Sequence, residues 1–479
     1  MEAEGVIPVH LLLATAAKVL CSAVFLSERD ETEALRNSVW HALQVHSLPE
    51  VFLPLAQVET DREARQVTMR LRLDKATVER IVTGYRDQYP ELAADWGAET
   101  ERLNRLGTAA RTARFLGDQG SVILRRGDDR MFFKPAPVRS ALPNASDMPW
   151  PMGDAIGPRH ARIDEAIAVA LRDPDACTVA VVVLHKGQIV GEGYAPGLNV
   201  DSQLESWSMG KSLTATLIGR LIHDGMLSLD QPAPISAWQH PDDPRRAITI
   251  RDLLQMSSGL RFSGHHDARS SWLSYIPDQF YVYSEAIDIF DFAISRPAEF
   301  PPQTVGRYRN CDPLSLGYIV KQAVTRRLAQ DYLTWPQVTL FDHIGIRRQI
   351  LETDLYGNFI LSGFDYGTAR NWARLGLLYL RDGVWDGKRL LPEGWSRFVS
   401  TPGPAWEQPV YGAQFWLNRI GEFALPSDAY MMSGSGQQRV FIVPSADLVI
   451  VRLGHSRGHS HSVPSINAML RTTMSALSQ

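Results

Sequence analysis

Ser208 and Lys211 form the only Ser-x-x-Lys in the chain. A serine hydroxyl becomes a nucleophile when a neighbouring base accepts its proton. Residues three apart share one face of a helix, and the stretch from Lys211 to Leu221 has few helix breakers and leucines at helical spacing. The spacing predicts that the Lys211 amine faces the Ser208 hydroxyl, where burial or a neighbouring cation must lower the lysine's pKa. In a first helical turn, the Ser208 backbone N–H is also available to an oxyanion. The alternative is an ordinary helix start with a solvated lysine.

A Tyr-x-Asn sequence occurs twice, as Tyr308-Arg-Asn310 and as Tyr356-Gly-Asn358. Tyr308 precedes an apolar helical run at 314–320, which predicts a loop before a helix. The central glycine of the second sequence is typical of a plain turn. We therefore favour Tyr308 as the phenol that passes a proton to a leaving group. Asn310 would then orient the lysine or bind the substrate carbonyl.

The elements that must position these residues lie in the second of two sequence blocks. Residues 1–133 read as mixed helix and strand, predict a smaller α+β domain of open role, and carry no catalytic motif. Six prolines in residues 134–158 predict a linker. Residues 159–479 place β-hairpins at 178–194 and 439–453 around a mostly helical stretch. We expect an α/β domain there, with an antiparallel sheet flanked by helices, completed by the C-terminus, and a helical lobe beside it.

Residues 178–455 resemble the serine β-lactamase and penicillin-binding-protein family, especially its class C and esterase-like branch. The stretches that carry the resemblance are Ser206-Trp-Ser-Met-Gly-Lys-Ser212, Asp224-Gly-Met-Leu-Ser-Leu-Asp230 and Ile250-Arg-Asp-Leu-Leu-Gln-Met-Ser-Ser-Gly-Leu260, in the family's order. The resemblance implies a β-lactamase-like fold with Ser208 as the nucleophile and Lys211 as its base. It is strongest to enzymes that hydrolyse linear amides, such as 6-aminohexanoate-dimer hydrolase, and to related esterases.

The family's third motif, Lys-Thr-Gly or a variant, corresponds here to Met432-Ser-Gly-Ser-Gly-Gln437, which lacks the lysine. That cation attracts the carboxylate of β-lactam and D-Ala-D-Ala substrates, so its absence argues against strong β-lactamase or transpeptidase activity. Ser433, Gly434 and Ser435 are nevertheless candidate substrate-binding residues, because glycine permits close backbone approach. A backbone N–H near Ser435 is the expected second oxyanion donor. The alternative is a glycine-rich turn that leads into a strand.

The predicted function is a serine hydrolase that cleaves an ester or amide bond of a small molecule through an acyl-enzyme on Ser208. No metal or organic cofactor is expected. Two alternatives stay open. One is a penicillin-binding or peptidoglycan-sensing module with slow turnover, and the other is a non-catalytic scaffold that retains the motifs. The sequence leaves the substrate and the oligomeric state open.

The composition excludes several other classes. A net charge of −4 gives no electrostatic reason to expect nucleic acid as a partner. The cysteines form no paired motif, and a histidine cluster near the C-terminus has no carboxylate or cysteine nearby to complete a ligand set. We therefore expect no disulfide framework and no metal site, and we expect the histidines to lie in a polar loop. The cysteines are Cys21, Cys177 and Cys311, and the clustered histidines are His455, His459 and His461.

The apolar stretch at 7–26 is interrupted by His10 and Lys18 and follows Glu2 and Glu4, where a secretory leader would carry positive charge. We expect a buried helix of the first domain instead. Localisation stays open, since the resemblance implies the cell envelope whereas the want of a convincing leader favours the cytoplasm.

Overall fold

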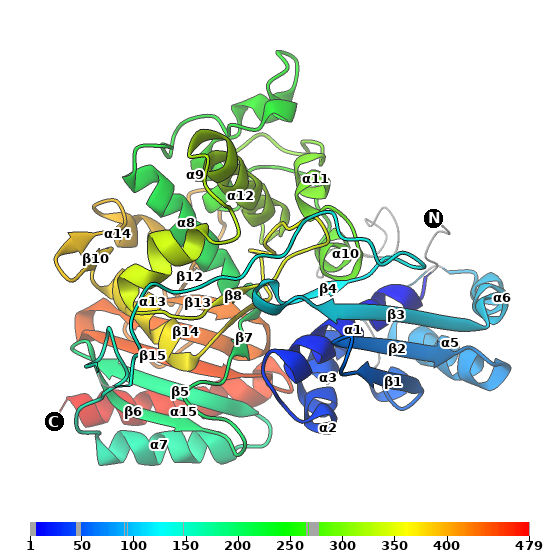
Figure 1. The fold of residues 1–479 in the computed structure, drawn as a ribbon, viewed down its shortest axis with the longest axis horizontal. Coiled ribbons are helices and arrows are strands. Elements are labelled where there is room, and N and C mark those ends of the chain that lie inside the picture. The colour runs from blue at the N-terminus through cyan, green and yellow to red at the C-terminus, as the bar shows by residue number, and fades with distance from the viewer. Residues whose placement is uncertain are drawn as a thin grey trace. The chain divides into compact units, whose positions relative to one another are not determined.

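The computed structural model of the 479-residue chain describes residues 6–44, 49–90, 92, 94–146, 148–264, 267 and 277–478, without the side chains of residues 459–461. The chain divides into two compact units, whose elements are labelled in Figure 1. The first unit contains Met1–Pro135, Phe262–Phe292 and Thr353–Asn358, and the second contains Ala136–Arg261, Ala293–Glu352 and Phe359–Gln479.

A four-stranded antiparallel sheet with the order β1-β2-β3-β4 forms the centre of the first unit. Burial alternates along β2 and β3, as expected for strands with one covered face. The helix α1 covers the sheet by packing against β2, β3 and β4 (Figure 1). The predicted α+β character is therefore confirmed. The elements are β1 (Ala56–Asp61), β2 (Gln66–Arg72), β3 (Thr108–Phe115), β4 (Ser121–Ile123), α1 (Val9–Phe25), α2 (Glu31–Ala34), α3 (Trp40–Gln44), α4 (Pro49–Phe52), α5 (Lys75–Gln88), α6 (Trp96–Leu106) and α10 (Asp278–Ser284).

The helix α1 is the apolar N-terminal stretch, and the prediction of a buried helix is confirmed. Lys18, which interrupts the apolar run, is only 1% exposed and donates a hydrogen bond to the backbone carbonyl of Ser121 on β4. That bond gives the buried amine a polar partner on the sheet that α1 covers. In the described part of the chain, no helix has both the length and the apolar character needed to cross a membrane.

The first unit is not one continuous stretch of chain, which differs from the predicted block at 1–133. Arg111 on β3 is buried and pairs with Glu285 Oε1 at 2.9 Å. A buried guanidinium requires a counter-charge, and here it comes from 174 residues further along the chain. The proline-rich stretch predicted as a linker belongs mostly to the second unit. There, Asp154 accepts a hydrogen bond from Arg374 at 2.8 Å.

A six-stranded antiparallel sheet with the order β12-β13-β14-β15-β5-β6 forms the centre of the second unit. The predicted hairpins are β5–β6 and β14–β15, and β15 pairs with β5, so the C-terminal strands complete the sheet. The helices α7 and α15 cover one face through a shared apolar core, whereas α13 packs against β14 and β15 on the other (Figure 1). These elements are β5 (Thr178–His185), β6 (Gln188–Tyr194), β12 (Trp416–Leu417), β13 (Tyr430–Gly434), β14 (Gln438–Val443), β15 (Leu448–Gly454), α7 (Ala161–Arg172), α13 (Ala369–Leu380) and α15 (His459–Leu477).

The chain between the two hairpins contributes the predicted helical lobe. Its helix α8 has apolar or small residues nearly all round and is buried along almost its whole length, and α12 packs against both α8 and α9. A small sheet has the strand order β7-β9-β8. Only β7 comes before α8 in the sequence, and this strand leads into the helix. The helix α11 (Ile289–Ile294) begins in the first unit and ends in the second. The remaining elements of the second unit are α8 (Gly210–His223), α9 (Ile250–Leu254), α12 (Cys311–Gln322), α14 (Trp395–Val399), β7 (Leu204–Glu205), β8 (Ile350–Leu351), β9 (Asp365–Gly367), β10 (Val384–Trp385) and β11 (Lys388–Arg389).

A buried ion pair joins α13 to β6 and generates a test of this architecture. Arg370 donates to both carboxylate oxygens of Glu192, at 2.6 and 2.9 Å, and both side chains are less than a tenth exposed. Loss of one partner strands a buried charge and costs roughly 3–5 kcal/mol. We expect Arg370→Met to lower the free energy of unfolding by about that amount in urea titrations. Asp230→Asn, which removes the partner of the half-buried Arg251, should cost less than about 1 kcal/mol. Equal losses in the two variants would contradict this assignment.

Candidate functional site

Ser208 lies in a tight turn between β7 and α8, as its predicted place at a helix start requires. The turn, Trp207–Met209, is a 3₁₀ helix in which Trp207 has a φ of +48°, a region that bulky side chains avoid. Pairing with β9 holds the turn, because the Ser206 N–H donates to the Asp365 carbonyl at 2.9 Å. Ser208 is half-buried while both of its neighbours are buried. The turn therefore presents the Ser208 side chain at an accessible position.

The Lys211 amine lies directly beside this hydroxyl. Its Nζ is 2.9 Å from Ser208 Oγ and donates to the Ser362 carbonyl at 2.6 Å. The side chain is 1% exposed. Burial lowers the pKa of Lys211 well below its ordinary value, and the attraction of Asp365 opposes this only in part. The desolvation that the sequence prediction required is thus present.

Tyr308 lies in the loop that precedes α12, as predicted, and is half-buried. The centre of its ring is 4.8 Å from Lys211 Nζ, and the ring packs against Trp416 with centroids 5.4 Å apart. Asn310 is fully buried and directly precedes α12. The second Tyr-x-Asn lies in the first unit, where Tyr356 accompanies a turn closed on Asp354. The structure thus brings Tyr308, and not the other tyrosine, to Lys211.

The candidate third segment ends β13 beside the Ser208 turn. Ser433 and Gly434 are its last two residues, and Ser435 opens the following 3₁₀ turn. A Cβ on Gly434 would lie 2.1 Å from the carbonyl oxygen of Ser206, so only glycine permits this approach of β13 to the turn. The close approach expected of the glycine-rich segment is therefore present in the fold.

Arg439 is a charged neighbour of this segment that the sequence patterns above do not identify. It lies opposite Ser433 on β14, and its Nη1 donates to the Gly434 carbonyl at 3.1 Å. Burial lowers the pKa of Arg439 to about 10. A single arginine at the start of an otherwise apolar strand is the signal that could have found it, since strands buried on both faces rarely carry an isolated charge.

Two buried aspartates of the second unit have raised pKa values. Burial raises the pKa of Asp312 to about 7 even though it accepts a hydrogen bond from Ser258 Oγ at 2.6 Å. Burial and the neighbouring Glu352 raise the pKa of Asp365 well above its ordinary value, against the opposing effect of Lys211. Neither carboxylate oxygen of Asp365 has a hydrogen-bond partner among the described residues. Of the two acids, Asp365 acts directly on Lys211.

His455, the first residue of the histidine cluster, lies in the loop between β15 and α15, as predicted, but this position is buried and not solvent-facing. The His455 Nε2 accepts a hydrogen bond from the indole of Trp207 at 3.0 Å, directly next to Ser208. The side chains of His459 and His461 lie outside the described part of the structure. Within that part, no three His, Cys, Asp or Glu side chains are grouped closely enough to hold a metal ion.

The approach of Gly434 to the turn generates a test of the site's geometry. Gly434→Ala forces a methyl group against the Ser206 carbonyl and should destabilise the second unit by about 1–3 kcal/mol in urea unfolding. Gly157→Ala is the matched control, because a Cβ there meets nothing within 4 Å, and it should stay within about 0.5 kcal/mol of the parent. A tolerated Gly434→Ala would mean that β13 does not approach the turn this closely.

Comparison with known proteins extends these observations. The Beta-lactamase family model matches residues 163–468, more than half of the chain. The 6-aminohexanoate-dimer hydrolase of Paenarthrobacter ureafaciens is 24% identical over 324 residues, which cover 60% of this chain and 76% of that protein. A provisionally assigned 6-aminohexanoate-dimer hydrolase from Bacillus anthracis superposes with a TM-score of 0.53 at 22% identity, covering 71% of this chain and 87% of the other. A family VIII carboxylesterase superposes with a TM-score of 0.50 at 14% identity, covering 67% and 99%.

The solved structures confirm the predicted β-lactamase-like fold of the larger part of the chain. The candidate site lies entirely within the residues that the family model matches. Because that match extends over more than half of the sequence, the chain belongs to the Beta-lactamase family.

Proposed function

We propose that the second unit is a serine hydrolase that cleaves an ester or a linear amide bond of a small molecule. The observation that carries the proposal is the buried Lys211 amine, 2.9 Å from the Ser208 hydroxyl. The names of the relatives support the substrate class, since one is a 6-aminohexanoate-dimer hydrolase and another a carboxylesterase. All residues of the proposed reaction lie in one compact unit.

In the proposed reaction, neutral Lys211 accepts the Ser208 proton while Ser208 Oγ attacks the substrate carbonyl carbon. The tetrahedral intermediate collapses to an acyl-enzyme as the proton passes to the leaving alcohol or amine through Tyr308. Water then attacks the acyl carbon, Lys211 accepts its proton, and the acid is released with Ser208 restored. The proton that Lys211 takes from water returns to Ser208 Oγ as the acid leaves, so the protons balance without a further reagent. Asn310, fully buried beside Tyr308 in sequence, is the proposed partner of the substrate carbonyl or the lysine.

The proposed oxyanion donors are the backbone N–H groups of Ser208 and Ser435. The geometry of the third segment supports the second of them. The C=O and N–H of one trans peptide point in opposite directions. Arg439 Nη1 donates to the Gly434 carbonyl at 3.1 Å, so the N–H of Ser435 in the same peptide points away from this buried guanidinium. Ser433 and Gly434 then line the substrate's approach along the edge of β13.

The same segment supports neutral acyl substrates over β-lactams. No lysine occupies the third motif, and the Arg439 Nη1 group already donates to the carbonyls of Gly434 and Gln438, at 3.1 and 2.9 Å. A substrate carboxylate would have to displace these bonds to reach Arg439 Nη1. The Nε of Arg439 has no hydrogen-bond partner among the described residues, but it is buried. We therefore expect slow or negligible reaction with penicillins.

Intact-mass analysis tests the nucleophile. A fluorophosphonate probe should add once to the parent protein and not to Ser208→Ala, and hydrolysis of a p-nitrophenyl ester should fall at least about 1,000-fold in that variant. Ser202→Ala, which changes a half-buried serine six residues earlier, should leave both unchanged. A stable penicillin adduct without ester turnover would favour the penicillin-binding alternative. No adduct with either reagent would favour the scaffold.

The depressed pKa of Lys211 predicts the pH dependence. Only the neutral amine accepts a proton, so kcat/KM should fall as pH drops below the pKa of Lys211, and this acid limb should lie well below 10.5. Lys211→Arg keeps the charge permanently and should lower kcat/KM by about 100-fold or more. Asp312 also titrates at about 7, so Asp312→Asn is the control and should retain the limb. Loss of the limb in Asp312→Asn would assign it to the acid and refute Lys211 as the base.

A further inference from the structure

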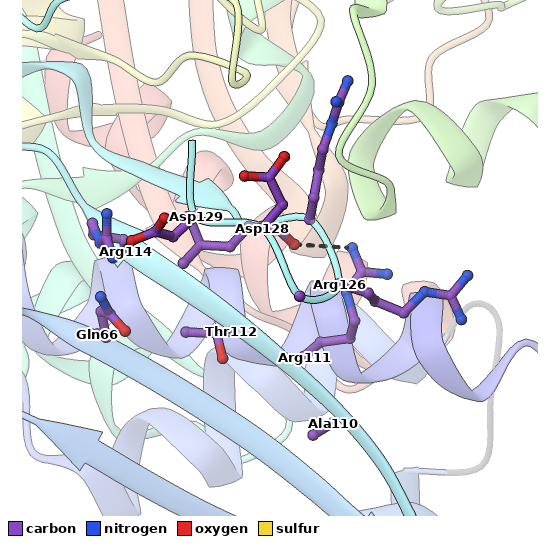
Figure 2. Close-up of a pocket in the computed structure, with 11 residues that line it drawn as sticks. Gln66, Ala110, Arg111, Thr112, Arg114, Arg126, Asp128 and Asp129 are labelled. Atoms are coloured by element: carbon purple, nitrogen blue, oxygen red, sulfur yellow. Dashed lines mark hydrogen bonds and ion pairs between the residues drawn. The ribbon is translucent and has the colours of Figure 1, made fainter. Parts of the chain in front are cut away.

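The first unit contains a pocket of about 500 Å³ whose lining comes from β2, β3 and the loop that follows β4 (Figure 2). Four arginines line it: Arg111, Arg114, Arg125 and Arg126. The pocket lies outside residues 163–468, to which the family match extends, and in the other compact unit from Ser208. Neither the family nor the proposed hydrolysis therefore accounts for it.

Arg111 forms the buried wall of the pocket. The side chain is 2% exposed and its Nη2 donates to Glu285 at 2.9 Å. Its Nε and Nη1 have no hydrogen-bond partner among the described residues. A buried charged donor without a partner is destabilising. An anion that entered the pocket would supply the missing acceptors at a guanidinium already held in place by Glu285.

Arg125 and Arg126 bring further positive charge to the opening. Two aromatic residues hold the Arg125 side chain in place. It donates a hydrogen bond to the Tyr356 hydroxyl, and its guanidinium lies 4.6 Å from the centre of the Phe132 ring. Arg126 is exposed and makes no ion pair with another described residue. Figure 2 shows Arg111 and Arg126 at the same end of the pocket, with Arg114 at the other.

Negative charge in the lining does not cancel these arginines. Asp129 is 3.4 Å from Arg114, and Asp128 is 3.5 Å from Arg130, which does not line the pocket. The pKa of the neighbouring His10 is lowered to about 4, chiefly by burial and further by Arg126 and Arg111, whereas Glu285 opposes them. The positive charge that the aspartates leave uncompensated and the unpartnered Nε and Nη1 of Arg111 therefore belong to the same pocket.

We propose that this pocket binds a small organic anion through a carboxylate or phosphate group held by Arg111, Arg125 and Arg126. Planar guanidinium groups bind such oxyanions in a bidentate manner. Thr112 and Gln66 also line the pocket and offer polar groups to the rest of the ligand. The first unit is on this account a ligand-binding unit attached to a hydrolase.

Calorimetric titration of the full chain tests the proposal, with inorganic phosphate and citrate as probes at ionic strength fixed with sodium chloride. We expect saturable binding of at least one probe, weakened at least tenfold in Arg126→Gln. Phosphate alone would indicate a phosphate ester as the ligand, and citrate alone a carboxylate. Arg111→Lys, which keeps the charge beside Glu285 but loses the fork of donors, should weaken binding similarly.

Arg72→Gln is the matched control, because it removes the same charge from an exposed position of the first unit. It should bind as the parent does. Ester hydrolysis at Ser208 should be unchanged in Arg126→Gln. Absence of saturable binding by both probes, or equal binding by the parent and Arg126→Gln, would overturn the proposal without bearing on the hydrolase.

Discussion

A lysine amine that is 1% exposed must either find a counter-charge or give up its proton more readily than in water. Lys211 is close to the Ser208 hydroxyl and the Ser362 carbonyl, at 2.9 and 2.6 Å, and makes no ion pair with a described residue. Asp365 attracts it only from a greater distance. Neither neutral partner supplies the counter-charge that would offset the burial of an ammonium. The lowered pKa of Lys211 is thus a consequence of how closely α8 is enclosed.

That enclosure depends on two backbone approaches that a side chain would prevent. A Cβ on Gly210 would lie 1.9 Å from the Asp365 carboxylate, and one on Gly434 would lie 2.1 Å from the Ser206 carbonyl. The first contact sets α8 against β9 and the second sets β13 against the turn before α8. Because β9 and β13 follow α8 by more than 140 residues of sequence, the candidate site forms only when the sheet and the lobe are both folded.

Local sequence patterns predict those parts of the structure that depend on residues close together in the sequence. The helix after Ser208, the two hairpins and the buried N-terminal helix are of this kind, since hydrophobic periodicity and turn residues determine them. Pairings between distant residues leave no such pattern. Nothing near Arg111 indicates Glu285 as its partner, so the sequence predicts a continuous first block where the structure has a discontinuous unit. His455 reads as part of a polar loop because the indole that buries it is 248 residues earlier.

Buried cations hold the backbone of the third segment. The family's lysine is absent, yet two buried arginines lie behind the segment. Arg439 donates to the carbonyls of Gly434 and Gln438, and Arg452 to those of residues 436 and 437, at 2.8 and 3.0 Å. Donors engaged in this way fix the peptide planes of the turn, and with them the direction of its N–H groups. They offer little to a substrate carboxylate. We propose that the cations of this chain shape the oxyanion donors that an ester or amide carbonyl needs, and do not serve the carboxylate of an anionic β-lactam.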